Sequence, residues 1–106
     1  MDINLDEVVV RDNPEAKRYE ARVGDALATI TYQRTPGQIT FIHTLVPPAL
    51  AGHHIADKMA HTVLEEARAA GLAVIPRCPY VAAYIQRHPE YTDLVPPEER
   101  ALYLSG

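Results

Sequence analysis

The chain has one cysteine, no tryptophan and no long run of apolar residues. The single cysteine, Cys78, excludes an internal disulfide, which suits the reducing cytoplasm. No apolar run comes near the roughly 20 residues that a membrane-spanning helix needs. The acidic segment 2–7 also lacks the apolar centre of a secretory leader. We therefore expect a cytoplasmic protein without a membrane partner.

Positive charge is scarce as well. Lysine and arginine together number 10 against 14 aspartates and glutamates, which gives a formal net charge of −4. This balance offers no basic surface of the kind that nucleic-acid-binding proteins carry, so we expect no nucleic-acid partner. Apolar residues make up 47% of the 106 residues, which is enough for a hydrophobic core in one domain, whereas the chain is too short for two. We expect a monomer with one domain over residues 1–106.

The first half of the chain has the alternation of apolar and polar residues that is typical of half-buried strands. Tyr19, Ala21 and Val23, for example, alternate with Glu20 and Arg22. Turn-forming residues separate the strands at 12–14, 24–25 and 35–37. Short turns between successive strands predict an antiparallel meander. The predicted strands cover residues 7–10, 19–23, 26–33 and 38–46.

Alternation in the last of these strands predicts its two faces. One face carries Ile39, Phe41, His43 and Leu45. The other carries Thr40, Ile42, Thr44 and Val46.

The second half predicts a strand, helix, strand, helix order. Apolar residues at helical spacing indicate a long helix that ends at Gly71, and this inward set is Ile55, Met59, Val63, Ala67 and Ala70. The continuously apolar segment 72–76 indicates a strand that is buried on both faces and runs parallel to the strand before the helix. A second helix is predicted over 80–88, and a short, loosely held turn or helix begins near residue 96. The fold class is therefore α/β (α+β), with a mixed sheet.

The junction at 45–56 has the features of a ligand site. Pro47 and Pro48 end the strand, and Gly52 allows the backbone to approach a ligand closely. The helix that follows opens with free N–H groups and the positive end of its dipole. Such a helix start binds phosphate.

This order of elements, together with four sequence segments, resembles the Gcn5-related N-acetyltransferases (GNAT), and in particular a small acetyltransferase-like family. The segments are 43–48 and 52–56, then 74–85, and then His88-Pro89-Glu90-Tyr91. The resemblance covers about half of the chain, and its specific part is the cysteine-proline-aromatic segment at Cys78 followed by the segment 88–91. It implies a GNAT-like mixed sheet in which the parallel pair of strands splays apart.

The resemblance also implies acetyl-CoA as the cofactor and an unidentified amine as the acceptor. Pantetheine is expected along the strand end, and the pyrophosphate is expected on the turn and the helix start. The implied cofactor-binding residues are Thr44, Leu45, Val46, Gly52, His53, His54, Ile55 and Ala56. The chain departs from the family pattern at Ala51, where arginine or glutamine is usual, at His54, where a second glycine is usual, and at Leu45, where glutamate is frequent.

Three residues are candidates for the chemistry, and each has an ordinary structural alternative. Cys78 either takes the acetyl group or lies beside the cofactor's sulfur, unless it is a small core residue. His43 either accepts the proton of the amine or is a histidine at the edge of the core. Tyr84 either protonates the departing thiolate, as a tyrosine on this helix does in larger relatives, or packs in the core.

A metal site is not expected, because His54 and His61 are two turns apart and one cysteine adds little. Two other functions remain open beside the acetyltransferase. The chain could bind CoA without transferring the acetyl group, or it could be a small interaction protein that uses an exposed strand edge. The short chain also suggests an open acceptor site, which suits an amine on a protein or a polyamine.

Overall fold

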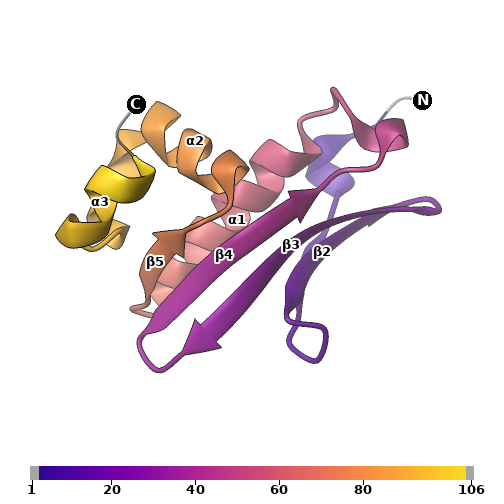
Figure 1. Cartoon of the computed structure of the whole chain (residues 1–106). Coiled ribbons are helices and arrows are strands. Elements are labelled where there is room, and N and C mark those ends of the chain that lie inside the picture. Colours follow the sequence, from indigo (N-terminus) through magenta and orange to yellow (C-terminus); the bar gives the residue numbers. More distant parts are fainter. Residues whose placement is uncertain (1–2, 105–106) are drawn as a thin grey trace.

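The computed structural model describes residues 3–104 as a mixed α+β fold. Its five-stranded sheet has the order β1-β2-β3-β4-β5, in which only β4 and β5 are parallel. Figure 1 shows α1 behind the sheet and α2 beyond the end of β5. The elements are η1 Leu5–Glu7, β1 Val10–Asn13, β2 Arg18–Val23, β3 Ala26–Thr35, β4 Gln38–Leu45, η2 Pro48–Leu50, α1 Ile55–Ala69, β5 Ala73–Pro76, α2 Pro79–Arg87, η3 Pro89–Leu94 and α3 Pro97–Tyr103, where η marks a 3-10 helix.

The predicted meander is confirmed, with corrections at both ends of its first strand. The turn expected at 12–14 begins only at Pro14, because Asp12 and Asn13 still pair with β2. Residues 7–10 were expected to be extended, but Asn4 Oδ1 accepts a hydrogen bond from the Asp6 N–H and caps the turn η1. Because this turn occupies Leu5–Glu7, β1 starts only at Val10, which pairs with Ala21.

The long helix begins and ends where the apolar spacing predicts. Ile55, Met59, Val63 and Ala67 are buried against the sheet, but Ala70, which was expected to face inward, is exposed because the helix already ends at Ala69. Gly71 has φ +70° and closes the helix, since its N–H donates to Arg68 O and the next N–H donates to Ala67 O.

The parallel pair splays as expected. The register of β4 with β5 runs from Gln38–Ala73 to Phe41–Pro76 and ends there. One further bond, from the Cys78 N–H to Phe41 O at 2.7 Å, marks the point where the chain turns away into α2. β4 continues to Leu45, still paired with β3 on its other side, and Figure 1 shows this extension running past β5.

A β-bulge in β4 corrects the predicted faces of this strand. Thr31 pairs with His43 and the next residue, Tyr32, pairs with Phe41, so Ile42 is an extra residue on β4. Ile39 and Phe41 point into the core as predicted. Beyond the bulge the alternation is inverted, so that Thr44 takes the inner face and His43 and Leu45 take the outer face. The expectation that His43 shares the face of Phe41 was therefore wrong.

The inner face is the face that α1 covers. Tyr19 is cross-strand partner to Ile30, which is partner to Thr44, and the Tyr19 hydroxyl donates a hydrogen bond to Glu66 of α1. The outer face carries the next residues along each strand, among them Arg18 and Thr31 beside His43.

The C-terminal segment folds back on α1. Tyr91 of η3 is buried, and its hydroxyl lies 3.0 Å from His61 Nδ1 and 2.5 Å from Glu65 Oε2. The segment His88-Pro89-Glu90-Tyr91 thus ends α2 and anchors η3 to α1, in agreement with a structural role. α3 forms the predicted terminal helix, where Arg100 Nε donates to Val95 O.

Candidate functional site

A pocket of about 290 Å³ lies at the start of α1, next to the segment that connects β4 to this helix. Five of the predicted cofactor-binding residues line it, together with four residues that were not predicted. The predicted ones are Val46, Gly52, His54, Ile55 and Ala56. The additional ones are Leu50, Ala51, Asp57 and Tyr80.

The turn in front of α1 has the backbone of a glycine-rich loop. Gly52 has φ +79° and His54 has φ +63°, so both lie in the left-handed region. The family pattern places a second glycine at His54, and the positive φ gives the physical reason. Histidine adopts this conformation at a cost of about 1–2 kcal/mol relative to glycine. His54 thus has the left-handed backbone conformation that glycine adopts most easily.

The first turn of α1 supplies unused donors. Ile55, Ala56 and Asp57 precede the first intrahelical bond, which runs from the Lys58 N–H to His54 O. The 15-residue helix adds the positive end of its dipole at this point. The predicted ligand His53 differs from these residues, because its N–H already donates to Leu50 O at 3.4 Å. The helix start can therefore hold an anion through three amides.

A carboxylate of the helix start links the pocket to α2. Asp57 accepts hydrogen bonds from the Tyr80 hydroxyl and, at 3.4 Å, from Arg87 Nη2, and its other oxygen lies 3.6 Å from His54 Nδ1. The Tyr80 hydrogen bond holds the pKa of Asp57 below its usual value. Burial, followed by the same hydrogen bond, raises the pKa of Tyr80 to about 12. Tyr80 is thus a neutral donor, and Asp57 of the pocket wall also contacts the exposed Arg87 of α2.

The outer end of β4 forms the second part of the site. Beyond Phe41 the backbone groups of β4 that point toward β5 have no β5 partner, so an extended amide-containing ligand could pair with them as an added strand. Thr44 lies at this edge, and its Oγ1 is 3.0 Å from Cys78 Sγ. Leu45 is 55% exposed, and Val46 is partly buried and reaches the pocket. The free edge therefore leads directly into the pocket.

The three predicted catalytic residues do not come together. Cys78 is 1% exposed and belongs to the core on the side of α1, whereas His43 is exposed on the outer face. Tyr84 is 5% exposed, and its ring stacks on His88 with centroids 4.1 Å apart. Burial raises the pKa of Tyr84. The sheet thus separates His43 from Cys78, while Tyr84 lies one helical turn after Tyr80 of the pocket.

Comparison with known proteins agrees with this geometry. A family model described as GCN5-related N-acetyl-transferase matches residues 18–94, which is more than half of the chain. The chain belongs to this family. The match runs from β2 to the end of η3 and so includes the splayed strands, the turn and both flanking helices. A search of curated proteins finds no match to the chain.

The GNAT family and the mixed sheet confirm the predicted fold. Within residues 3–104 no helix is long and apolar enough to cross a membrane. The same residues contain no group of three or more histidine, cysteine, aspartate or glutamate side chains that could hold a metal ion.

Sequence reasoning missed the contribution of α2 to the pocket. Asp57 is not among the residues that the apolar spacing turns inward, and Tyr80 enters the sequence analysis only as the start of the second helix and as the aromatic after Cys78-Pro79. Their contact depends on how α2 packs against α1, which no local pattern encodes. The available signal was Cys78-Pro79, which starts α2 at the carboxyl end of β5, where ligands bind in open sheets with parallel strands.

Proposed function

We propose that this GNAT-family chain binds acetyl-CoA and transfers the acetyl group to an amine. One observation carries the proposal: the unpaired edge of β4 leads into a pocket whose wall is the turn and free helix start of α1. An extended amide chain that ends in phosphates has the two chemical features that these surfaces accept. The residues of the site therefore fit CoA.

The binding residues divide into two groups. Pantetheine amides pair with the backbone at Thr44, Leu45 and Val46, as a strand pairs with an exposed edge. The pyrophosphate is held by the N–H groups of 55–57, and the left-handed Gly52 brings the backbone close to it. The carboxylate of Asp57 opposes the phosphates, and the guanidinium of Arg87 beside it offsets this charge.

Acetyl-CoA supplies a thioester, which the neutral amine attacks to form an amide and release CoA. The chain's own residues then have three roles. Backbone N–H groups at Thr44–Val46 polarise the thioester carbonyl. His43 accepts the proton that the amine loses on the outer face. Tyr84 donates a proton to the departing thiolate, because its raised pKa keeps the hydroxyl protonated at neutral pH.

Burial of Cys78 favours direct transfer over an acetylated cysteine. A thiol that is 1% exposed and in contact with Thr44 Oγ1 gives an acceptor amine no access to an acetyl group on Sγ. Cys78 instead supports Thr44 at the β4 edge. Replacing Cys78 by Ala is therefore expected to lower the affinity for acetyl-CoA modestly, and to leave turnover measurable.

A second function is favoured by one observation. His43 and Cys78 lie on opposite faces of the sheet, so no compact group of reactive side chains surrounds the β4 edge. A protein that binds CoA without turning it over has the same pocket and needs no such group.

Thermal unfolding at rising acetyl-CoA tests the binding step, with CoA and ATP as controls. At a hundred times the dissociation constant, binding adds about 2.7 kcal/mol, which raises Tm by roughly 10 °C or more in a domain of this size. We expect a saturable rise with acetyl-CoA and CoA, and none with ATP. No rise at millimolar acetyl-CoA would contradict the proposal.

Mass spectrometry of amine mixtures incubated with the protein and acetyl-CoA then separates the two functions. Acetylated products that depend on His43 and Tyr84 support the transferase. Saturable binding without any acetylated amine supports the CoA-binding module.

A further inference from the structure

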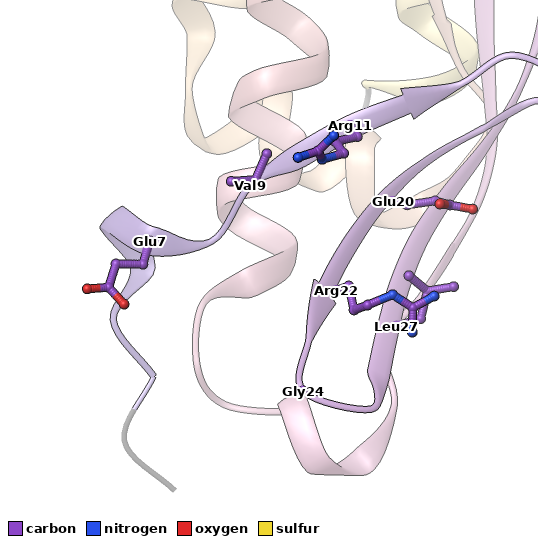
Figure 2. A pocket seen from close by; sticks show the side chains of 7 residues that line it. All are labelled: Glu7, Val9, Arg11, Glu20, Arg22, Gly24 and Leu27. Atoms are coloured by element: carbon purple, nitrogen blue, oxygen red, sulfur yellow. The ribbon is translucent and has the colours of Figure 1, made fainter.

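A groove of about 410 Å³ lies on the outer face of the sheet, away from the pocket at α1. Figure 2 shows its side chains, with Arg11 on β1, Glu20 and Arg22 on β2, and Leu27 on β3. Val9, Glu7 and Gly24 complete the lining. Val9 is 55% exposed, so the groove combines an apolar patch with two arginines.

The two arginines are available to a ligand. Among residues 3–104 neither Arg11 nor Arg22 takes part in an ion pair, and both are exposed. Glu20 is already neutralised, because its Oε2 accepts hydrogen bonds from Arg18 Nε at 2.7 Å and from Asn13 Nδ2 at 3.1 Å. Among the charged side chains that line the groove, two guanidinium groups are thus balanced only by the carboxylate of Glu7. In a chain of net charge −4 this is a local excess of positive charge.

The groove is joined to the β4 edge by one row of residues across the sheet. Arg11 pairs with Glu20, Glu20 with Thr29, and Thr29 with Leu45. Cross-strand partners share a face, so this row lies on the outer face with His43. Three strand spacings of roughly 4.8 Å separate its ends by about 14 Å, which an extended peptide spans in about four residues at roughly 3.4 Å each.

We infer that this groove is the docking site for the acceptor, and that the acceptor is an acidic peptide. Arginine binds carboxylates through two parallel hydrogen bonds, and Val9 and Leu27 offer contact to apolar side chains between the acids. The acceptor amine lies at the β4 edge beside His43, and an acidic side chain about four residues away lies between Arg11 and Arg22. A polyamine is disfavoured because the arginines repel it. This inference rests on the proposed function.

Peptide binding without acetyl-CoA tests the groove directly. The probes are fluorescein-labelled peptides with one lysine and a pair of glutamates placed one, four or eight residues from it, and a version with glutamines at the four-residue spacing. Anisotropy should give the highest affinity for glutamates at four residues. The glutamine peptide should bind roughly tenfold more weakly, and the difference should shrink with salt.

The variant Arg11→Glu/Arg22→Glu should lose at least this tenfold preference. Arg34→Glu is the matched control, because Arg34 is also exposed and forms no ion pair with any of the described residues, but lies near the opposite end of β3. It should bind the peptide within twofold of the original chain. Circular dichroism confirms that each variant is folded, and the acetyl-CoA thermal shift should be unchanged in all three proteins.

Three outcomes would overturn the inference: no saturable binding of any acidic peptide, an equal loss in Arg34→Glu, or equal binding of an oligonucleotide of the same charge. Each leaves the acetyl-CoA thermal shift as an independent result. Failure of the groove is thereby distinguished from failure of the proposed function.

Discussion

The two halves of β4 differ in almost every physical respect. Residues 38–41 are hydrogen-bonded to strands on both sides, and Ile39 and Phe41 are fully in the core. Ile42 is the unpaired residue of the bulge and residues 43–45 pair with β3 alone, and Ile42 and Leu45 are the exposed large apolar residues of this strand. The first half therefore stabilises the fold, whereas the second half leaves backbone groups free for a ligand. One strand serves both purposes because the bulge at Ile42 separates them.

Truncation of β4 side chains gives the largest expected contrast. Phe41→Ala removes a ring that is 0% exposed and leaves a cavity, so we expect a loss of about 3–5 kcal/mol in the free energy of unfolding. Leu45→Ala removes an exposed side chain and should change the free energy of unfolding by no more than about 0.5 kcal/mol. Urea denaturation measures both. Similar losses in the two variants would mean that the halves do not differ as described.

The turn after β4 should show a smaller effect. Gly52→Ala introduces a side chain at φ +79°, where open space leaves backbone strain as the cost, so we expect a loss of about 1–2 kcal/mol. His54→Gly relieves the same strain at φ +63° and should gain less than about 1 kcal/mol, because glycine also raises the entropy of the unfolded chain. Urea denaturation shows whether Gly52→Ala loses stability and His54→Gly gains it. A stable Gly52→Ala variant would rule out the left-handed turn.

The smallest effect concerns Tyr80 at alkaline pH. Its pKa of about 12 is above the ordinary value of 10.0, so its contribution to stability is complete below pH 10 and is lost as pH rises toward 12. The stability difference between the original chain and Tyr80→Phe should therefore shrink over this range. Because Tyr80 is only half-buried, solvent screening should keep this stability difference below about 1 kcal/mol.

Tyr32 is the matched control, because burial and a hydrogen bond to Asp12 raise its pKa to about 12 as well, far from the pocket. Tyr32→Phe should show the same loss between pH 10 and 12. Only Tyr80→Phe should weaken acetyl-CoA binding. If Tyr32→Phe weakened it equally, Tyr80 would have no special place in the site.

Most of the fold follows from local sequence patterns. The spacing from Ile55 to Ala67 defines the long helix, Gly71 ends it, and the apolar segment after it indicates a buried parallel strand. These features depend on periodicity and turn chemistry, which a single sequence contains. The pocket wall from Gly52 to Ala56 was predictable for the same reason, since it lies where a helix begins.

The remainder depends on contacts between distant segments. The bulge could not be read from the sequence, because Phe41 and Ile42 are both apolar and either could continue the alternation. For the same reason, the face of β4 on which His43 lies was predicted wrongly. The places of Tyr80 and Asp57 depend on the packing of α2 on α1, which brings together residues 23 positions apart.

Hydrogen exchange with and without acetyl-CoA tests the central claim most directly, because the claim concerns backbone amides at two separate places. We predict slower exchange at residues 44–46 at the end of β4 and at residues 55–57 at the start of α1, and no change at Val10–Asn13 of β1. Protection at the helix start alone would limit binding to the phosphates and contradict the role of the β4 edge. Unchanged exchange at both places, at saturating acetyl-CoA, would contradict the account as a whole.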